Sequence, residues 1–256
     1  MASADERAAE GEELVREVTV RLVDFMGDDV RVAEAARVSF GRAAGAGAAA
    51  QEVEVGGERR KRRLAGEADA RLIRYLGAHA HWTPSAHVQA TFYVAAPVYV
   101  ARQLMRHTVG LVPNEVSRRY VDAPPQFFAP RAWRRRSETK KQGSHPTATV
   151  DLDAATREAV DAALAAARRG YAALLAAGVA PEQARGLLPM ATMTAWYWTG
   201  SLAAFARVCD LRLAEDAQAE TRAVAAQIDA HMRRLFPAAW AAARGEPGPA
   251  AAASSE

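Results

Sequence analysis

The stretch Ala101–Tyr120, ARQLMRHTVGLVPNEVSRRY, determines what fold and what chemistry we expect of this chain. The residues before it, 90–101, read ATFYVAAPVYVA and are apolar, which predicts a buried strand leading into a helix that begins at Pro97. Gly110 and Pro113 then end that helix and place a polar loop after it. The arginines and amides of this stretch therefore emerge from a buried element.

The polar side chains of this segment suit an anionic ligand. Residues four apart share one helical face, so Arg102 and Arg106 are expected to point the same way, with Gln103 beside Arg106. Arginine donates hydrogen bonds in a planar fork that matches phosphate oxygens, and the hydroxyl of Ser117 adds another donor. Arginines at helical spacing are more often a solvated face with surface ion pairs. The apolar flank favours the alternative, a site for a small anionic molecule.

Composition sets the frame for the whole chain. Its 256 residues are 50% hydrophobic and 25% charged, which is ordinary for a globular protein and enough for a sizeable core. A net charge of +3 is too small to argue for nucleic-acid binding, and no apolar run approaches the roughly 20 residues that span a bilayer. Residues 1–13 are acidic and do not resemble a secretory signal, so a cytoplasmic protein is expected.

The hydrophobic pattern predicts strands and short helices in the N-terminal half and a helical C-terminal half. We expect one domain over 14–240, with disordered tails over 1–13 and 241–256. The basic run after Trp133 is a candidate lid, and 41–63 is expected to be a mobile surface loop. The elements indicated by periodicity are strands at 18–22 and 88–95 and helices at 32–37, 68–80, 151–177, 181–208 and 213–235.

Four motifs follow one another in a recognisable order. They are His81–Pro84 (HWTP), Ala96–Gln103 (APVYVARQ), Arg106–Thr108 (RHT) and Asn114–Tyr120 (NEVSRRY). Flanking elements accompany them: ARVSF at 36–40, Arg185 with Leu188 and Pro189, and Leu211 with Arg212 and Gln218. Together these motifs resemble the flavin-dependent thymidylate synthase (ThyX) family, and the likeness extends over most of residues 18–236.

This resemblance implies a specific enzyme. Members of the family are homotetramers of α+β subunits, with a mixed sheet packed by helices and active sites formed between subunits. They hold FAD, reduce it with a nicotinamide cofactor such as NADPH, and take a one-carbon unit from 5,10-methylenetetrahydrofolate to methylate a uracil nucleotide, dUMP or UMP. The flavin passes a hydride toward the pyrimidine, so no cysteine needs to attack the ring. The single cysteine, Cys209, is accordingly expected to pack in the core.

The resemblance also implies a role for individual residues. Arg212 matches the arginine that faces the uracil ring, and His81 matches a histidine near the flavin where folate stacks; these two are the expected catalytic residues. The positions that match the nucleotide grip, together with Arg212, are Gln103, Arg106, Ser117, Arg119 and Arg185. The positions that match the flavin site are Ser39, Thr83, Arg106, His107, Asn114 and Glu115.

Simpler interpretations exist for several of these residues. His79, His81 and His87 lie close together in the chain, but without neighbouring acidic ligands we expect no metal site. Ser39 and Thr83 could be helix caps. Trp196 and Trp198 are expected to lie in the core.

The departures from the family pattern suggest a specialised enzyme. The loop Val109–Pro113 is one residue longer than the pattern, and several positions on the flavin side differ: Trp82, Ala86, Thr108, Ser201, Ala203 and Arg207. The family has a branch of this kind, the PolB-type enzymes of polyoxin biosynthesis, which methylate UMP as well as dUMP. The alternative from another class is a nucleotide- or nucleic-acid-binding protein without catalysis, which the runs ERRKRR and RRRSETKK motivate.

Overall fold

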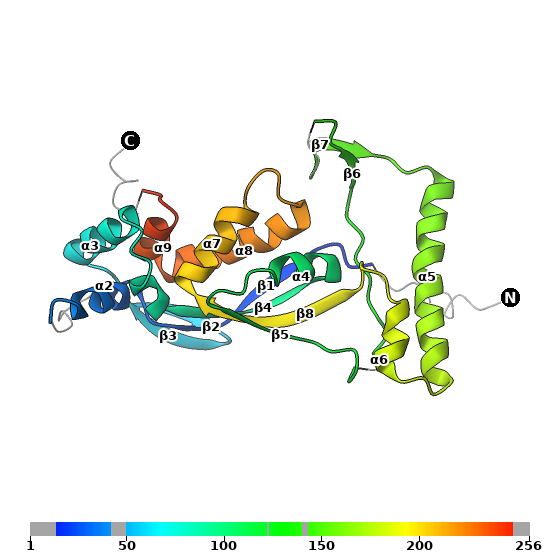
Figure 1. Ribbon diagram of the computed structural model, residues 1–256, viewed down its shortest axis with the longest axis horizontal. Coiled ribbons are helices and arrows are strands. Elements are labelled where there is room, and N and C mark those ends of the chain that lie inside the picture. The colour runs from blue at the N-terminus through cyan, green and yellow to red at the C-terminus, as the bar shows by residue number, and fades with distance from the viewer. Residues whose placement is uncertain (1–13, 42–49, 122, 140–142, 248–256) are drawn as a thin grey trace. The chain divides into compact units, whose positions relative to one another are not determined.

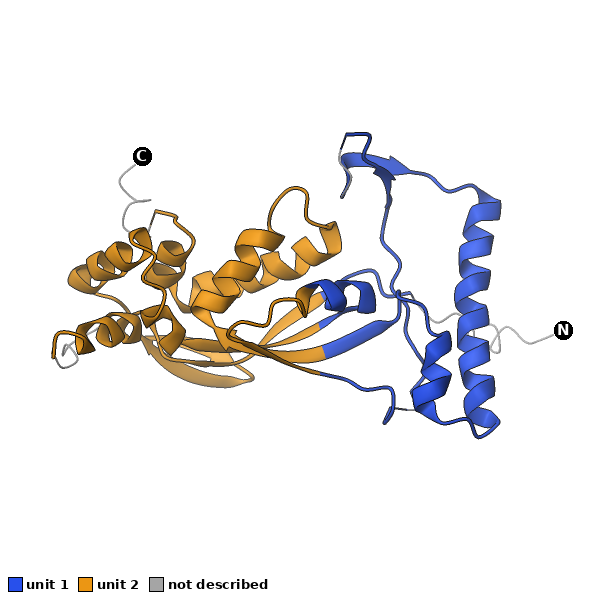
Figure 2. Ribbon diagram, viewed as in Figure 1, with its two compact units in different colours: residues 1–18, 95–103, 115–195 blue, residues 19–94, 104–114, 196–256 orange. Residues whose placement is uncertain are grey.

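The computed structural model describes residues 14–41, 50–121, 123–139 and 143–247. The chain divides into two compact units, each assembled from separate stretches of sequence (Figure 2). Unit 1 contains residues 1–18, 95–103 and 115–195, and unit 2 contains residues 19–94, 104–114 and 196–256. Within the described ranges, no helix is both long and apolar enough to cross a membrane.

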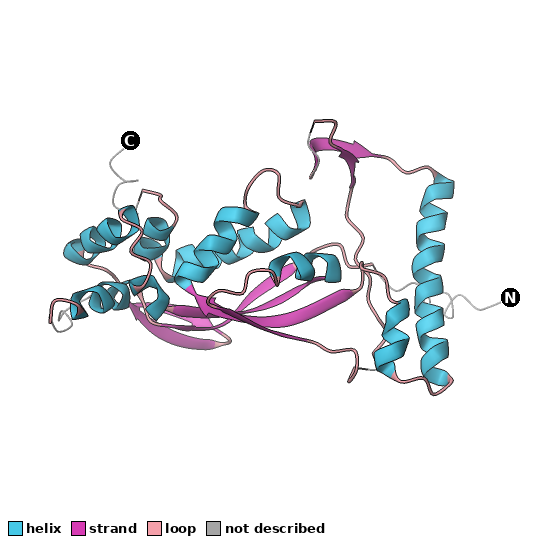
Figure 3. Cartoon of the chain, in the orientation of Figure 1, coloured by secondary structure: helices cyan, strands magenta, loops and turns pink. Residues whose placement is uncertain are grey.

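Helices and strands both contribute to the fold, which confirms the predicted mixture of α and β structure and the helical C-terminal region (Figures 1 and 3). The strands are β1 (Thr19–Met26), β2 (Ala50–Val55), β3 (Glu58–Arg63), β4 (Gln89–Pro97), β5 (Leu111–Glu115), β6 (Trp133–Arg136), β7 (Ser144–Val150) and β8 (Met193–Ser201). The helices are α2 (Asp29–Val38), α3 (Glu67–Ala78), α4 (Val98–Leu104), α5 (Ala154–Ala176), α6 (Pro181–Ala184), α7 (Leu202–Arg212), α8 (Ala219–Leu235) and α9 (Pro237–Ala243), with short 3-10 turns η1 (Pro84–His87) and η2 (Arg185–Leu187).

The four-stranded sheet has the strand order β1-β4-β8-β5, and two antiparallel ribbons, β2-β3 and β6-β7, accompany it. Strand β4 alternates buried and partly exposed residues along most of its length, as its apolar run predicted. In unit 2, the ring of Phe92 on β4 packs edge-on against Phe205 at 5.1 Å, and Trp198 packs against Phe205 at 5.4 Å. These aromatic side chains form the centre of the core of unit 2.

The helix predicted over 181–208 is wrong. Its middle is strand β8, and only short helical pieces flank it. Trp196 and Trp198 are 1% and 0% exposed, whereas Tyr197 between them is 47% exposed, which is the alternation of a strand. The expectation that both tryptophans lie in the core is confirmed.

The loop predicted over 41–63 is also wrong where the structure describes it, because residues 50–63 form the β2-β3 hairpin. Gly56 and Gly57 both adopt positive φ angles, 62° and 85°, and occupy the two-residue turn that such a hairpin favours. The remaining residues of that loop, 42–49, lie outside the described ranges.

The basic run ERRKRR is strand β3, and most of its arginines have partners inside unit 2. Arg62 is 6% exposed and donates a hydrogen bond to the carbonyl oxygen of Leu235 at 3.0 Å. Arg63 donates to both Asp28 and Glu34, and its Nε lies 2.9 Å from Asp28 Oδ2. Arg62 and Arg63 therefore stabilise the fold of unit 2, whereas residues 58–61 of the same run are exposed.

Two further predicted loops contain strands. The candidate lid after Trp133 forms the β6-β7 hairpin in unit 1, and residues 140–142 of that segment lie outside the described ranges. Pro113, expected to lie in a loop, sits within β5, which is the edge strand of the sheet. An edge strand tolerates proline because one of its sides makes no ladder hydrogen bonds.

Unit 1 contains the longest helix, α5, which begins where the Asp153 side chain accepts a hydrogen bond from the backbone N–H of Thr156 at 2.7 Å. Helix α5 contributes Tyr171, which is 2% exposed, to a small core that also contains Phe127. Arg118 lies over the ring of Tyr171 with its guanidinium carbon 6.0 Å from the ring centroid. This contact anchors the segment that follows β5.

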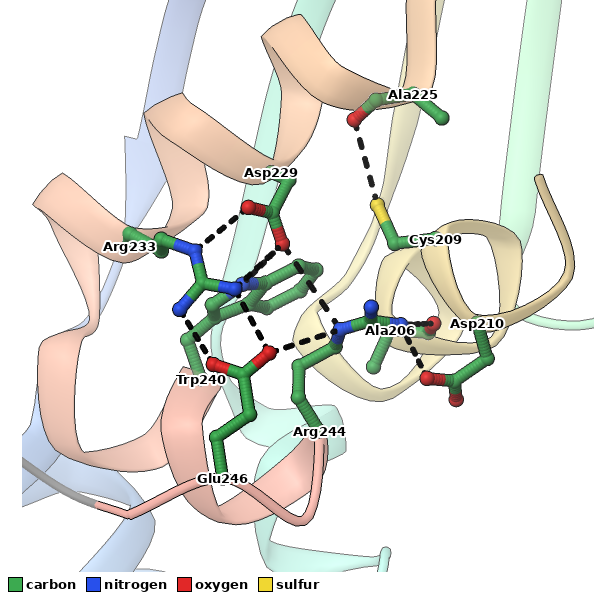
Figure 4. Close-up of polar contacts among 9 residues, drawn as sticks. All are labelled: Ala206, Cys209, Asp210, Ala225, Asp229, Arg233, Trp240, Arg244 and Glu246. Atoms are coloured by element: carbon green, nitrogen blue, oxygen red, sulfur yellow. Dashed lines mark hydrogen bonds and ion pairs between the residues drawn. The ribbon is translucent and has the colours of Figure 1, made fainter. Parts of the chain in front are cut away.

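The end of unit 2 is held by a charged network (Figure 4). Asp229 on α8 accepts hydrogen bonds from Arg233 and from the indole N–H of Trp240, the latter at 2.9 Å. Arg244 pairs with Asp210 on α7, and Glu246 pairs with Arg233. Disorder was predicted for 241–256, which is wrong for 241–246; residues 248–256, like 1–13, lie outside the described ranges.

Candidate functional site

The residues with expected roles belong to both units. In unit 2 they are Ser39, His81, Thr83, Arg106, His107, Asn114 and Arg212. In unit 1 they are Gln103, Glu115, Ser117, Arg119 and Arg185.

In unit 2 the structure brings His107 and Arg212 together. Arg212 is the last residue of α7, and its Nε donates a hydrogen bond to His107 Nε2 at 3.0 Å. Burial of the imidazole, followed by the positive charges of Arg212 and Arg207, lowers the pKa of His107 below its ordinary value of 6.5. The ring is therefore neutral at pH 7 and serves as an acceptor toward Arg212.

The loop that follows His107 is docked on the start of α7. Arg207 donates from Nη2 to the carbonyl oxygen of Val109 at 2.9 Å, and the backbone N–H of Ser201 donates to the carbonyl oxygen of Gly110 at 3.2 Å. Gly110 has a φ of +74°, which favours glycine, and its missing side chain leaves room for Ala204. Ser201 caps α7, since its hydroxyl oxygen accepts from the N–H of Ala204 at 3.2 Å.

In unit 1, Ser117 and Arg119 form a local pair. Ser117 Oγ accepts from Arg119 Nε at 3.1 Å, and the Arg119 guanidinium lies 5.1 Å from the centroid of the Tyr120 ring. Glu115 accepts a hydrogen bond from the hydroxyl of Thr194 on β8 at 2.7 Å. The hydroxyl and the guanidinium predicted to grip a phosphate are thus adjacent on one exposed segment.

The other nucleotide positions are less closely grouped. Helix α4 ends at Leu104, so Arg106 lies in the turn after it, and the expectation that Arg102 and Arg106 share a helical face is wrong. Gln103 donates to the carbonyl oxygen of Tyr99 at 3.4 Å. Arg185 is exposed in η2, with its Nε 3.3 Å from the carbonyl oxygen of Glu182. Asn114, expected on a loop, lies exposed on β5.

His81 borders a cavity of about 300 Å³ in unit 2. The cavity is lined by α3, α7, α9 and the segment around η1, with Trp82, Ser85, Arg207 and Asp210 among its walls. His81 and Tyr75 contact each other edge-on, with their ring centroids 6.3 Å apart. Within the described part of the chain, no three His, Cys, Asp or Glu side chains are placed to hold a metal ion.

The helix-cap interpretation is not supported at either position. Ser39 follows α2 at its C-terminal end, so it does not cap the start of a helix. Thr83 precedes η1 but makes no side-chain capping hydrogen bond. Both residues are exposed, as a ligand contact requires.

Cys209 lies in the core of unit 2, as expected. It is 0% exposed, and its Sγ lies 3.6 Å from the carbonyl oxygen of Ala225 (Figure 4). Burial, followed by the nearby carboxylate of Asp229, raises the pKa of Cys209 to about 12. The buried thiol is therefore protonated at neutral pH and is not available as a nucleophile.

Sequence reasoning did not identify two of these contacts. Thr194 holds Glu115, and Arg207 holds the carbonyl of Val109. The partners are far apart in the chain, and a threonine on a strand carries no signal of such a role. For Arg207 the signal was its departure from the family pattern.

A family model described as thymidylate synthase complementing protein (Thy1) matches residues 21–238. Curated relatives agree with it. The flavin-dependent thymidylate synthase of Thermus thermophilus is 39% identical over 225 residues, which is 87% of this chain and 74% of that protein. The enzyme of the same name from Thermosipho africanus is 34% identical over 82% of this chain and 83% of its own length. This chain belongs to the flavin-dependent thymidylate synthase family.

Among solved structures, the chain is similar to a UMP/dUMP methylase, PolB from Streptomyces cacaoi. The structure of PolB bound with 5-Br dUMP superposes with a TM-score of 0.73 at 29% identity, over 92% of this chain and 98% of that chain. The structure of PolB bound with 5-Br UMP has a TM-score of 0.72 at 29% identity, over 93% of this chain and 99% of that chain. The family resemblance read from the motifs and the ThyX-like fold are thereby confirmed.

Proposed function

We propose that this protein methylates C5 of a uracil nucleotide, accepting both dUMP and UMP. The main support for this proposal is the family match over residues 21–238, together with the Ser117–Arg119 pair. PolB, similar along nearly its full length, has been solved with analogues of both nucleotides, which favours acceptance of both sugars here. One-carbon units come from 5,10-methylenetetrahydrofolate, and NADPH is the reductant.

FAD is the flavin we propose, and the residues present fit it. The donors and acceptors on and around β5 are exposed or half-buried, as a bound dinucleotide requires: Arg106, His107, Asn114 and Glu115, with Ser39 and Thr83 elsewhere in the chain. The flavin, when bound, supplies the hydride. Because the imidazole of His107 is neutral, it can offer the N–H of Nδ1 to a ligand while Nε2 accepts from Arg212.

In this proposal Arg119 and Ser117 of unit 1 bind the nucleotide phosphate, with Gln103 and Arg185 of the same unit. Arg106 of unit 2 is also proposed as a nucleotide contact. The pair orients itself, since Arg119 Nε is held by Ser117 Oγ and the planar guanidinium then presents its two terminal amino groups as a fork. A charge-assisted hydrogen bond contributes about 1.5–3 kcal/mol. Two or three of them are enough for micromolar binding.

Arg212 acts on the pyrimidine. Its positive charge stabilises the negative charge that develops on the carbonyl oxygen and ring nitrogen as C5 is activated. Cys209 plays no part, because the buried thiol stays protonated. His81, beside the cavity with Trp82, stacks against the folate ring system, and the cavity is at the small end of the range typical of ligand pockets.

We also propose a homotetramer whose active sites are completed by neighbouring subunits. Large apolar side chains next to the expected ligand residues are exposed: Phe40 (78%), Val109 (73%), Val112 (68%) and Tyr120 (77%). Exposed large apolar side chains beside ligand residues favour an interface. Light scattering is expected to give about four times 27.5 kDa, and a stable, active monomer would contradict the proposal.

A single assay tests the proposed activity. The purified protein is reconstituted with FAD, and initial rates with dUMP and UMP are compared at saturating methylenetetrahydrofolate and NADPH. Rates within about tenfold of each other support both substrates. A preference for dUMP above about a hundredfold would indicate an ordinary thymidylate synthase that does not use UMP. A protein that stays colourless and turns over neither nucleotide would refute the proposed enzymatic activity.

The same preparation addresses the alternative of nucleic-acid binding. Strand β3 carries one of the two motivating basic runs, and Arg62 and Arg63 are already engaged with Leu235, Asp28 and Glu34. We therefore expect the protein to elute from heparin at moderate salt. Elution only at high salt would favour the binding protein.

A further inference from the structure

Helix α7 and the segment from Leu104 to Leu111 are joined along the whole length of the helix. The contacts come from the N-cap Ser201, from Arg207 in the middle and from Arg212 at the last position. Ser201 donates to the backbone carbonyl of Gly110, and Arg207 donates to that of Val109. The third joins two side chains that the sequence separates by 105 residues.

The contact between Arg212 and His107 fixes the state of the imidazole. A guanidinium has only donors, so the ring nitrogen that faces Arg212 Nε at 3.0 Å must be the acceptor. The proton of the neutral ring then lies on Nδ1. A guanidinium is also planar, so the hydrogen bond that its Nε–H donates sets the plane in which its two terminal amino groups lie.

We propose that His107 is a positioning residue, whose Nε2 lone pair holds the guanidinium of Arg212 in the orientation in which it meets the uracil ring. This inference rests on the proposed function, in which Arg212 faces the pyrimidine. The loop contacts of Arg207 and Ser201 in turn keep His107 beside the end of α7. The effect of His107 on turnover is therefore exerted through Arg212.

The electrostatic surroundings keep His107 in the form that this role needs. The charged groups that act on it are Arg212 and Arg207, both from α7, and both oppose its protonation; the adjacent residue in its own segment, Arg106, is a third cation. Protonation would put a hydrogen on Nε2 and remove the acceptor. The His107–Arg212 hydrogen bond that orients the guanidinium therefore exists at a pH above the pKa of His107. It is lost as the pH falls through that pKa, which lies below 6.5.

The kinetic test is a double-mutant cycle in the reconstituted full-length enzyme. His107→Ala is expected to lower kcat about tenfold, the typical worth of one hydrogen bond to a charged group. In the Arg212→Ala background, His107→Ala should change kcat less than twofold, because the group it positions is gone. All values are expressed per bound FAD, so that loss of flavin, the other role proposed for His107, is counted separately.

His107→Gln is the matched control, because its amide oxygen can take the place of Nε2 but does not titrate. It should restore most of the activity lost in His107→Ala, and the acidic limb expected in the kcat profile of the unmodified enzyme should be absent. Multiplicative effects of His107→Ala and Arg212→Ala, or an unchanged acidic limb in His107→Gln, would overturn the proposal.

A measurement without turnover separates this inference from the proposed function. In protein labelled with ¹⁵N-histidine and ¹⁵N-arginine, His107 should carry its proton on Nδ1 at pH 7, and the Nε–H resonance of Arg212 should shift in His107→Ala. A protein with this signature but no methylation of either nucleotide would overturn the proposed function and the kinetic role of the pair. An active enzyme with the His107 proton on Nε2 would overturn the pairing alone.

Discussion

Gly200 lies on β8, two residues before α7 begins. Replacing it by alanine tests how closely Gly110 and Leu111 approach this end of β8. A Cβ at this position would lie 2.3 Å from Leu111 Cδ2 and 2.9 Å from the carbonyl oxygen of Gly110. The oxygen belongs to the backbone and accepts from Ser201, so it cannot rotate away as a side chain could. Overpacking of this kind costs about 1–3 kcal/mol, and the reduced entropy of the unfolded chain offsets about 0.4–1 kcal/mol. The net loss should be about 1–2 kcal/mol, or roughly 2–8 °C in Tm.

Urea unfolding at fixed protein and FAD concentrations measures this loss, with a lower midpoint and an unchanged slope as the expected result. Because the shift also moves Gly110, kcat should fall as the His107–Arg212 contact loosens. Gly186→Ala is the matched control, since a Cβ there meets nothing within 4 Å. If Gly200→Ala proves as stable as Gly186→Ala, the close approach of the loop to β8 is wrong.

Three other predictions concern single residues. Arg212→Ala should lower kcat strongly, whereas Arg119→Ala should mainly raise the nucleotide KM, because a phosphate contact acts equally in the ground and transition states; reversed phenotypes would contradict the assignment. Cys209→Ala should keep turnover, and a thiol reagent should modify the native protein only upon unfolding; rapid modification of the folded enzyme would count against the buried thiol. Burial alone would raise the pKa of Asp28, but hydrogen bonds from Arg63 outweigh it and lower the pKa below 3.8. The ionised Asp28 side chain therefore stabilises the folded protein above pH 3.8, and this stabilisation is lost as the pH falls through the lower pKa of the folded state. Unfolding midpoints measured between pH 5 and 2 should depend less on pH in Asp28→Asn than in the unmodified protein. An equal pH dependence in the two proteins would contradict the prediction.

Elements with strong periodicity or clear boundaries were predictable. Strand β4 and helix α5 lie within a few residues of their predicted ranges, because an apolar run and a long alanine-rich stretch with an Asp153 cap have few competing interpretations. Strand β8 was not predictable in this way. Its sequence, MTAWYWTGS, lies between two helix-forming stretches, and the local pattern of a short apolar run is the same for a strand and a buried helix.

The β2-β3 hairpin was missed for a different reason. Its turn residues Gly56 and Gly57 carry the signal of a two-residue hairpin, but the strands beside them are rich in Arg and Glu. Their stability comes from partners elsewhere in unit 2, such as Asp28 and Leu235, and not from their own hydrophobic pattern. Tertiary contacts of this kind do not appear in local sequence.

For the site, residue types were predictable and pairings were not. The motif order predicted ligand roles for Arg212, His107, Ser117 and Arg119, and the structure brings these residues together in two pairs. The Ser117–Arg119 pair follows from adjacency in the chain. The bond between His107 and Arg212 depends on how α7 is placed against the loop, which only the three-dimensional arrangement determines.

The discontinuous make-up of unit 2 has a consequence for synthesis on the ribosome. The last of its three stretches is residues 196–256. In this stretch Arg244 pairs with Asp210 on α7 and Glu246 pairs with Arg233 on α8, both on helices that are synthesised earlier. A nascent chain that has only reached α6 has β4 but lacks β8, the later neighbour of β4 in the sheet, and Phe92 on β4 has no Phe205 to pack against. At 5–20 residues per second this exposure lasts several seconds. Unit 2 therefore completes its folding only late in translation, and the growing chain is a substrate for chaperones until then.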